Sequence, residues 1–240
     1  MLKGAAILSL LLVVSGALSY RLGILPFGLA FYGFGLGLLA SALLSMAAAA
    51  MTFRRLARRQ PVGGLLAVML AGVTPVLVVI YTVGIAGFQA PPIHDISTDV
   101  VDPPVFIFAQ SQRQPDDNSL DYGGEKLAAQ QRQAYPDIRP LQLAVSQERA
   151  WSAALTVIDQ LGWQLLGEDA SQGQIEAVDR TPIMGFADDF VVRIKPQGEG
   201  VQIDLRSVSR VGVSDLGANA KRIRVFIEQL RYQLALPLEK

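Results

Sequence analysis

Two arginines near the C-terminus have the type and spacing needed to bind an anion. Side chains alternate along a strand, so Arg206 and Arg210 share one face of the predicted strand 201–210. The glycine-containing turn that follows leads into a helix whose first amides attract negative charge, and guanidinium groups hold phosphate or carboxylate through paired hydrogen bonds. We therefore predict a ligand site that consists of Arg206, Arg210, Asp215, Asn219 and Arg222. In the alternative interpretation Asp215 caps the helix and pairs with an arginine, which locks strand to helix.

A second set of candidates contains the single histidine and four carboxylates: His94, Asp95, Asp99, Asp188 and Asp189. If they converged, these groups would suit a metal ion or the acid and base work of a hydrolase. Adjacent residues of a strand point to opposite faces, however, so Asp188 and Asp189 cannot easily serve one substrate. The alternatives are that His94 and its neighbours fasten to the domain by hydrogen bonds, and that the two aspartates form a turn or pair with Arg206 or Arg180. We predict no catalytic residue, no metal and no cofactor.

Composition excludes several classes of protein. The 240 residues contain no cysteine, which rules out disulfides and thiolate nucleophiles. Phosphate-binding loops, dinucleotide fingerprints, nucleophile elbows and His-Glu-x-x-His motifs are absent. The formal net charge is zero, but no acidic residue precedes Asp95, so the C-terminal part is acidic. An acidic domain lacks the positive surface that nucleic acid requires, and we predict no nucleic-acid partner.

Three apolar segments, at residues 2–20, 27–53 and 63–88, predict transmembrane helices and make the lipid bilayer a partner. Four arginines, at positions 54, 55, 58 and 59, lie between the second and third segments. Under the positive-inside rule this loop stays in the cytoplasm. The sequence thus predicts a multi-pass protein of a bacterial inner membrane with its C-terminal domain in the periplasm. The first segment is also compatible with a cleaved signal peptide.

Small residues recur at every fourth position of the second segment, at Gly33, Gly37, Ser41 and Ser45. Such a stripe lets another helix approach closely. It predicts packing against the first and third helices of the same chain or, alternatively, a homo-oligomer. Because the second and third segments contain no ionisable residue, this part of the chain is predicted to be an anchor rather than a conduit.

The chain divides into a membrane domain at residues 1–88, a tether rich in Pro, Gln and Asp at 89–137, and a soluble domain at 138–240. Apolar alternation and turn signals in the soluble domain predict a strand, a helix, four strands and a final helix. The expected fold class is α+β, an antiparallel sheet with two helices on one side. The elements are expected at residues 141–145, 146–161, 163–167, 174–181, 190–195, 201–210 and 216–236.

Several motifs carry a resemblance to a known family. Residues 206–223, RSVSRVGVSDLGANAKRI, are similar to the C-terminal signature of domain of unknown function 1499, as are PIHDISTD at 92–99, Tyr135-Pro136 and Asp188-Asp189. The resemblance implies an extracytoplasmic or membrane-attached protein and transfers no activity. The element order also resembles helix-grip modules of an envelope lipoprotein in the outer-membrane assembly machinery, which is an analogy of fold alone.

These observations favour a membrane-anchored periplasmic binding or interaction module of the cell envelope. Its partner would be an envelope protein or an anionic envelope ligand, and replacing Arg206 and Arg210 by alanine would then abolish capture without unfolding the domain. The second hypothesis is a periplasmic hydrolase that uses the carboxylates and His94.

Overall fold

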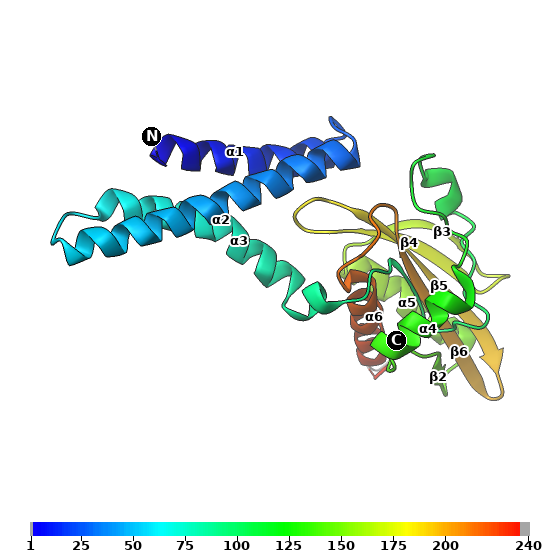
Figure 1. Cartoon of the computed structure of the whole chain (residues 1–240). Helices are drawn as coiled ribbons and strands as arrows, with labels where there is room; N and C mark the ends of the chain where they lie inside the picture. Colours follow the sequence, from blue (N-terminus) through cyan, green and yellow to red (C-terminus); the bar gives the residue numbers. More distant parts are fainter. Residues whose placement is uncertain (1, 236–240) are drawn as a thin grey trace. The chain divides into compact units, whose positions relative to one another are not determined.

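A computed structural model describes residues 2–235, which fold into two compact units. The first unit contains three helices, α1 (Leu2–Arg21), α2 (Phe27–Ala57) and α3 (Gly63–Val83) (Figure 1). Among the described residues, these helices are the ones long and apolar enough to cross a membrane. The third helix is shorter than the predicted 63–88, because Gly84 leaves the helical conformation with a φ of 74° and residues Ala86–Gln89 form the separate 3-10 helix η1.

Small residues of α2 pack against its neighbouring helices within the chain. A Cβ atom on Gly37 would lie 2.7 Å from the backbone nitrogen of Val13. Ser41 donates a hydrogen bond to Ser9 at 3.0 Å, and Ser45 donates one to a backbone carbonyl of α3 at 2.8 Å. Gly33 has no neighbour within 4 Å of such an atom. Intramolecular packing thus occupies three of the four residues of the stripe.

The second unit, which begins at residue 86, is built on an antiparallel sheet in the order β1-β6-β5-β4-β3, and β2 also pairs with β6. The α+β prediction is therefore confirmed. Two long helices, α5 (Gln147–Gln160) and α6 (Ala218–Ala235), pack against one face of the sheet (Figure 1). The strands are β1 (Asp95–Ser97), β2 (Leu141–Leu143), β3 (Gln164–Asp169), β4 (Gln174–Arg180), β5 (Ala187–Gln197) and β6 (Gly200–Ser209).

The apolar core lies between the sheet and these two helices. Alternate residues of β5 and β6 form its floor, as their sequence pattern predicts: Phe190, Val192, Ile194, Val201, Ile203 and Leu205. Trp163 stacks on Phe226 of α6 with ring centres 5.9 Å apart and meets Phe190 edge to face at 4.8 Å. Ser146, the first residue of the predicted helix 146–161, caps α5 by accepting a hydrogen bond from the backbone nitrogen of Arg149.

The opposite face of the sheet is covered by residues 98–122, which we call the strap. The sequence predicts a tether at residues 89–137, but in the structure this region contains β1, the 3-10 helix η2 (Ala109–Gln112) and α4 (Gly124–Ala134). Phe106 of the strap is 1% exposed and packs with Val191 and Val208 of the sheet. From α4, the amide of Gln131 accepts from the backbone nitrogen and donates to the carbonyl of Ser97. The polar composition of this region therefore serves hydrogen bonding to the sheet rather than solvation.

Candidate functional site

Arg222 of α6 lies at the centre of a polar cluster on the helix-covered face. Its guanidinium pairs with Asp188 of β5 at 2.6 Å and with Asp179 of β4 at 2.9 Å. Burial acts to lower the pKa of Arg222, and the two carboxylates hold it above its usual value. The guanidinium also donates to Asn219 and Ser207. Arg222 thus ties the helix to three strands.

Asp215 and Asn219 fix the beginning of α6. Asp215 accepts hydrogen bonds from the backbone nitrogens of Gly217 at 2.8 Å and Asn219 at 2.9 Å, which is a capping arrangement. Burial raises the pKa of the Asp215 carboxyl. The Asn219 amide donates to the carbonyl of His94 and to Ser209, each at 2.9 Å. The Asp215 side chain therefore caps the helix, and the Asn219 side chain joins the helix to the sheet.

Arg206 of β6 points to the other face and is enclosed by the strap. It forms a paired contact with Asp95 at 2.9 and 2.8 Å, and it also donates to the carbonyls of Pro104 and Leu120. Its guanidinium lies 5.3 Å from the ring centre of Phe106 and 5.4 Å from that of Tyr122. Burial, together with the nearby Asp95, raises the pKa of Tyr122 to about 12. Arg206 is 2% exposed.

Asp189 pairs with two arginines on the strap-covered face. Arg210, which directly follows β6, and Arg113 of the strap each contact this carboxylate at 2.7 Å, and Asp189 itself is fully buried. Arg210 also donates to the strap carbonyl of Gln112 at 2.9 Å. The pair fastens the strap to the end of the sheet.

Glu176 of β4 provides a third fastening. Its buried carboxylate accepts hydrogen bonds from the backbone nitrogens of Ile107, Phe108 and Ala109, at 2.5 to 3.0 Å. These amides lead into the first residue of η2, Ala109, where unpaired N–H groups favour negative charge. A carboxylate of the sheet therefore serves as the cap of a helix in the strap.

The predicted ligand residues do not form one open cluster. Arg206 and Arg210 face the strap, whereas Asp215, Asn219 and Arg222 lie on the helix side. Every one of the five contacts other residues of the domain. For Asp215 the structure contains the predicted helix cap.

The secondary candidates are also separated. The His94 ring nitrogen lies 3.2 Å from the carbonyl of Val213, and Asp95 pairs with Arg206. Asp99 accepts hydrogen bonds from two backbone nitrogens of the strap and lies beside Arg193. Within residues 2–235, no three His, Cys, Asp or Glu side chains come together as metal ligands.

Asp188 and Asp189 point to opposite faces of the sheet, as their adjacency on a strand predicts. Their partners differ from the predicted Arg206 and Arg180. Asp188 pairs with Arg222 because both lie on the helix side, and Asp189 pairs with Arg210 and Arg113 on the strap side. Sequence alternation identifies the face of each aspartate but not the arginine that crosses to it.

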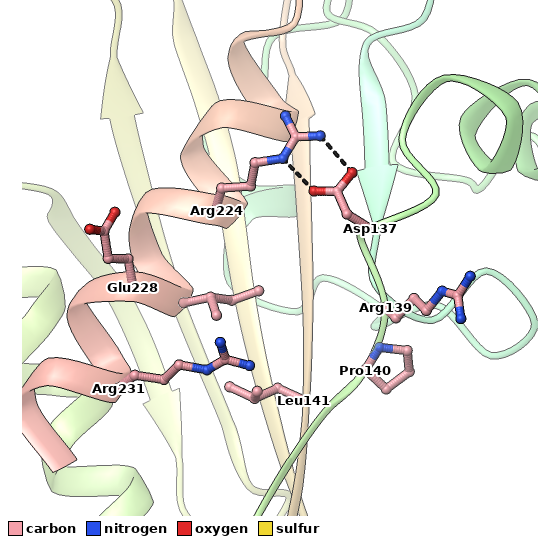
Figure 2. Close-up of a pocket in the computed structure, with 8 residues that line it drawn as sticks. Asp137, Arg139, Pro140, Leu141, Arg224, Glu228 and Arg231 are labelled. Carbon is pink, nitrogen blue, oxygen red and sulfur yellow. Dashed lines mark hydrogen bonds and ion pairs between the residues drawn. The ribbon is translucent and has the colours of Figure 1, made fainter. Parts of the chain in front are cut away.

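A pocket of about 480 Å³ lies between α6 and the residues that lead into β2. Arg224 closes one end through paired contacts with Asp137 at 2.6 and 2.8 Å. Figure 2 shows Arg231 extending from α6 over Leu141, whereas Arg139 points away from the helix. In the described part of the chain, Arg231 has no hydrogen-bond or ion-pair partner. The lining residues are Asp137, Arg139, Pro140, Leu141, Arg224, Ile227, Glu228 and Arg231.

Comparison with known proteins gives a family. The family model described as "Protein of unknown function (DUF1499)" matches residues 95–230, which is more than half of the chain. The chain belongs to the DUF1499 family. A solved structure described as the crystal structure of TTHA0849 from Thermus thermophilus is also similar. The match covers 40% of the present chain and 93% of the TTHA0849 chain, with 9% sequence identity and a TM-score of 0.26. A search of curated proteins finds no match.

The DUF1499 match begins at Asp95, the first residue of β1, and includes the whole strap. The matched region thus contains the sheet and two buried ion pairs, Asp95 with Arg206 and Arg113 with Asp189. No local pattern marks Glu176 or Arg113 as structural anchors, because their partners are 67 to 76 residues away in the chain. Arg231 was likewise missed, since it reads as an ordinary exposed residue of a helix.

Proposed function

We propose that this DUF1499 protein is a membrane-anchored, extracytoplasmic binding module of the cell envelope, and that it takes an anionic group in the pocket beside α6. Three apolar helices support the anchorage. The arginines at 54, 55, 58 and 59 support a cytoplasmic loop between α2 and α3, which directs the DUF1499 domain to the periplasmic side of a bacterial inner membrane.

The observation that carries the ligand proposal is the position of Arg231 over an apolar floor. Of the three arginines that line the pocket, Arg224 is paired with Asp137, and Arg139 donates to the carbonyl of Pro136 and points away from the helix, so Arg231 remains. Leu141 and Ile227 supply apolar surface beside it. A guanidinium that is free to form paired hydrogen bonds suits a phosphate or carboxylate. The floor suits the apolar part of the molecule that bears this group, as in an anionic phospholipid.

Replacing Arg231 by alanine is expected to weaken binding of an anionic probe about tenfold, because a hydrogen bond to a charged group contributes about 1.5–3 kcal/mol. The full chain in nanodiscs of phosphatidylcholine is titrated calorimetrically with inorganic phosphate and with a short-chain phosphatidylglycerol. Tighter binding of the second probe would indicate a lipid, and equal binding a free anion.

Lys221→Ala is the matched control, since Lys221 is an exposed cation of the same helix outside the pocket. It should bind both probes as the unmodified protein does. Equal loss in both variants would mean that only general surface charge attracts the probes. Unchanged affinity in Arg231→Ala, or no binding of either probe, would contradict the proposed site.

A further inference from the structure

The first strand of the DUF1499 sheet, β1, begins at the same end of the sheet at which β6 ends and the loop to α6 begins. Strand pairing places Asp95, the start of β1, opposite Val208 near the end of β6. The chain then turns through residues 211–217 into α6. We call residues 211–217 the β6–α6 loop.

The exposed side chains of the β6–α6 loop are both apolar. Val213 is 75% exposed and Leu216 is 41% exposed, whereas the one charged residue of the loop, Asp215, turns inward to cap α6. Leu216 has a φ of 52°, a left-handed conformation that bulky residues rarely adopt. The loop therefore presents two apolar side chains at a turn where polar residues or glycine are usual.

Hydrogen bonds hold this loop beside the residues that follow the last apolar helix. The backbone nitrogen of Asp215 donates to the carbonyl of Ile93 at 3.1 Å, and the carbonyl of Val213 lies 3.2 Å from the His94 ring nitrogen. Residues 84–92 connect Ile93 to the end of α3 at Val83. A connection of this length spans at most about 35 Å when fully extended, and it is shortened by η1. The loop is thus bonded to the first residues of the DUF1499 domain that follow this short connection.

The connecting residues are apolar as well. Ile85 is 74% exposed and Phe88 is 54% exposed. Apolar and aromatic side chains that flank a membrane span settle at the boundary between headgroups and acyl chains. These two residues are exposed and apolar, as are Val213 and Leu216 of the β6–α6 loop.

We propose that Val213 and Leu216 insert into the lipid surface on the side where α3 emerges, and that this contact fixes the orientation of the DUF1499 domain against the bilayer. The inference rests on the membrane anchorage in the proposed function. The occupant is the bilayer because a short connection leads from an apolar helix to Ile93 and His94, the two residues that contact this loop. Since the exposed side chains carry no charge, insertion should not depend on anionic lipid.

The absence of native cysteine allows single labels in the full chain. Val213→Cys, Val101→Cys and Leu70→Cys are each labelled with an environment-sensitive fluorophore and reconstituted in phosphatidylcholine vesicles that contain doxyl-labelled lipid. Val101 is the matched control: it is 90% exposed, and its neighbour Asp102 contacts Lys195 near the β5–β6 turn, at the opposite end of the sheet. Leu70 lies in α3.

The expected result is that the labels at positions 70 and 213 shift to shorter wavelength and lose most of their emission to the doxyl lipid, while the label at 101 keeps its emission. If the label at position 70 is quenched and the label at 213 behaves like that at 101, the loop does not insert, but the membrane anchorage by α3 is supported. If position 70 is not quenched, α3 does not span and the anchorage itself fails.

Discussion

Replacing Arg206 by methionine is expected to lower the free energy of unfolding of the DUF1499 domain by about 3–5 kcal/mol. The change would leave the carboxylate of Asp95, which is 4% exposed, without its cation. The carbonyls of Pro104 and Leu120 would also lose their donor. Domains of this size have free energies of unfolding of about 5–15 kcal/mol, so the change would remove a large share of the stability.

Tryptophan fluorescence during urea denaturation of the full chain in detergent measures this effect. Both tryptophans, Trp151 and Trp163, belong to the DUF1499 domain, so the signal reports on it alone. The control is Arg180→Met, which removes an exposed arginine. The sequence alone predicts that alanine at positions 206 and 210 spares folding. The buried ion pairs predict a loss of stability instead, and an unchanged midpoint in Arg206→Met would contradict the structural role.

Replacing Glu176 by glutamine is expected to cost about 3 kcal/mol, although the two side chains have nearly the same shape. The carboxylate accepts three amides of the strap, and hydrogen bonds to a charged group contribute about 1.5–3 kcal/mol each. A glutamine has only one accepting oxygen, and its NH₂ group would face an amide donor. Some amides at the start of η2 would therefore remain buried without a partner.

The same fluorescence measurement applies, with Glu168→Gln as the control. Glu168 is an exposed residue of the neighbouring strand β3, so loss of its charge should change stability by less than about 0.5 kcal/mol. Equal midpoints for the two variants would mean that Glu176 does not hold the strap.

Local patterns in the sequence were sufficient for β2 to β6 and for α5 and α6, but not for β1, which lies in the predicted tether. Alternation in β5 and β6 identified Phe190 and Ile203 as core residues, because strand geometry is decided by neighbours in the chain. The same rule placed Asp188 and Asp189 on opposite faces. Hydropathy and length likewise located the three apolar helices.

The strap and the roles of the arginines could not be obtained in this way. Arg206 and Asp95 are 111 residues apart, and no local pattern indicates that they meet. The sequence does not distinguish a surface arginine from a buried one, so the arginines of the C-terminal signature suggested an open anion site. The polar composition of the strap suggested solvation, whereas its few apolar anchors, such as Phe106, are enough once the sheet supplies partners.

The pocket was missed for a related reason. It exists only because residues 137–141 fold back beside α6, and the pairing of Leu141 with Ile203 brings them there. Arg231 becomes a candidate through this neighbour and not through its place in a helical pattern.

The strap is a fixed part of the DUF1499 domain, held by Arg206, Arg210 and Glu176, and the other structural roles depend on it. Hydrogen–deuterium exchange of the full chain tests this most directly at the amides of Ile107, Phe108 and Ala109, which bind Glu176. We expect these amides to exchange as slowly as those of β5. Exchange at the rate of an unstructured peptide, while β5 stays protected, would contradict a fixed strap.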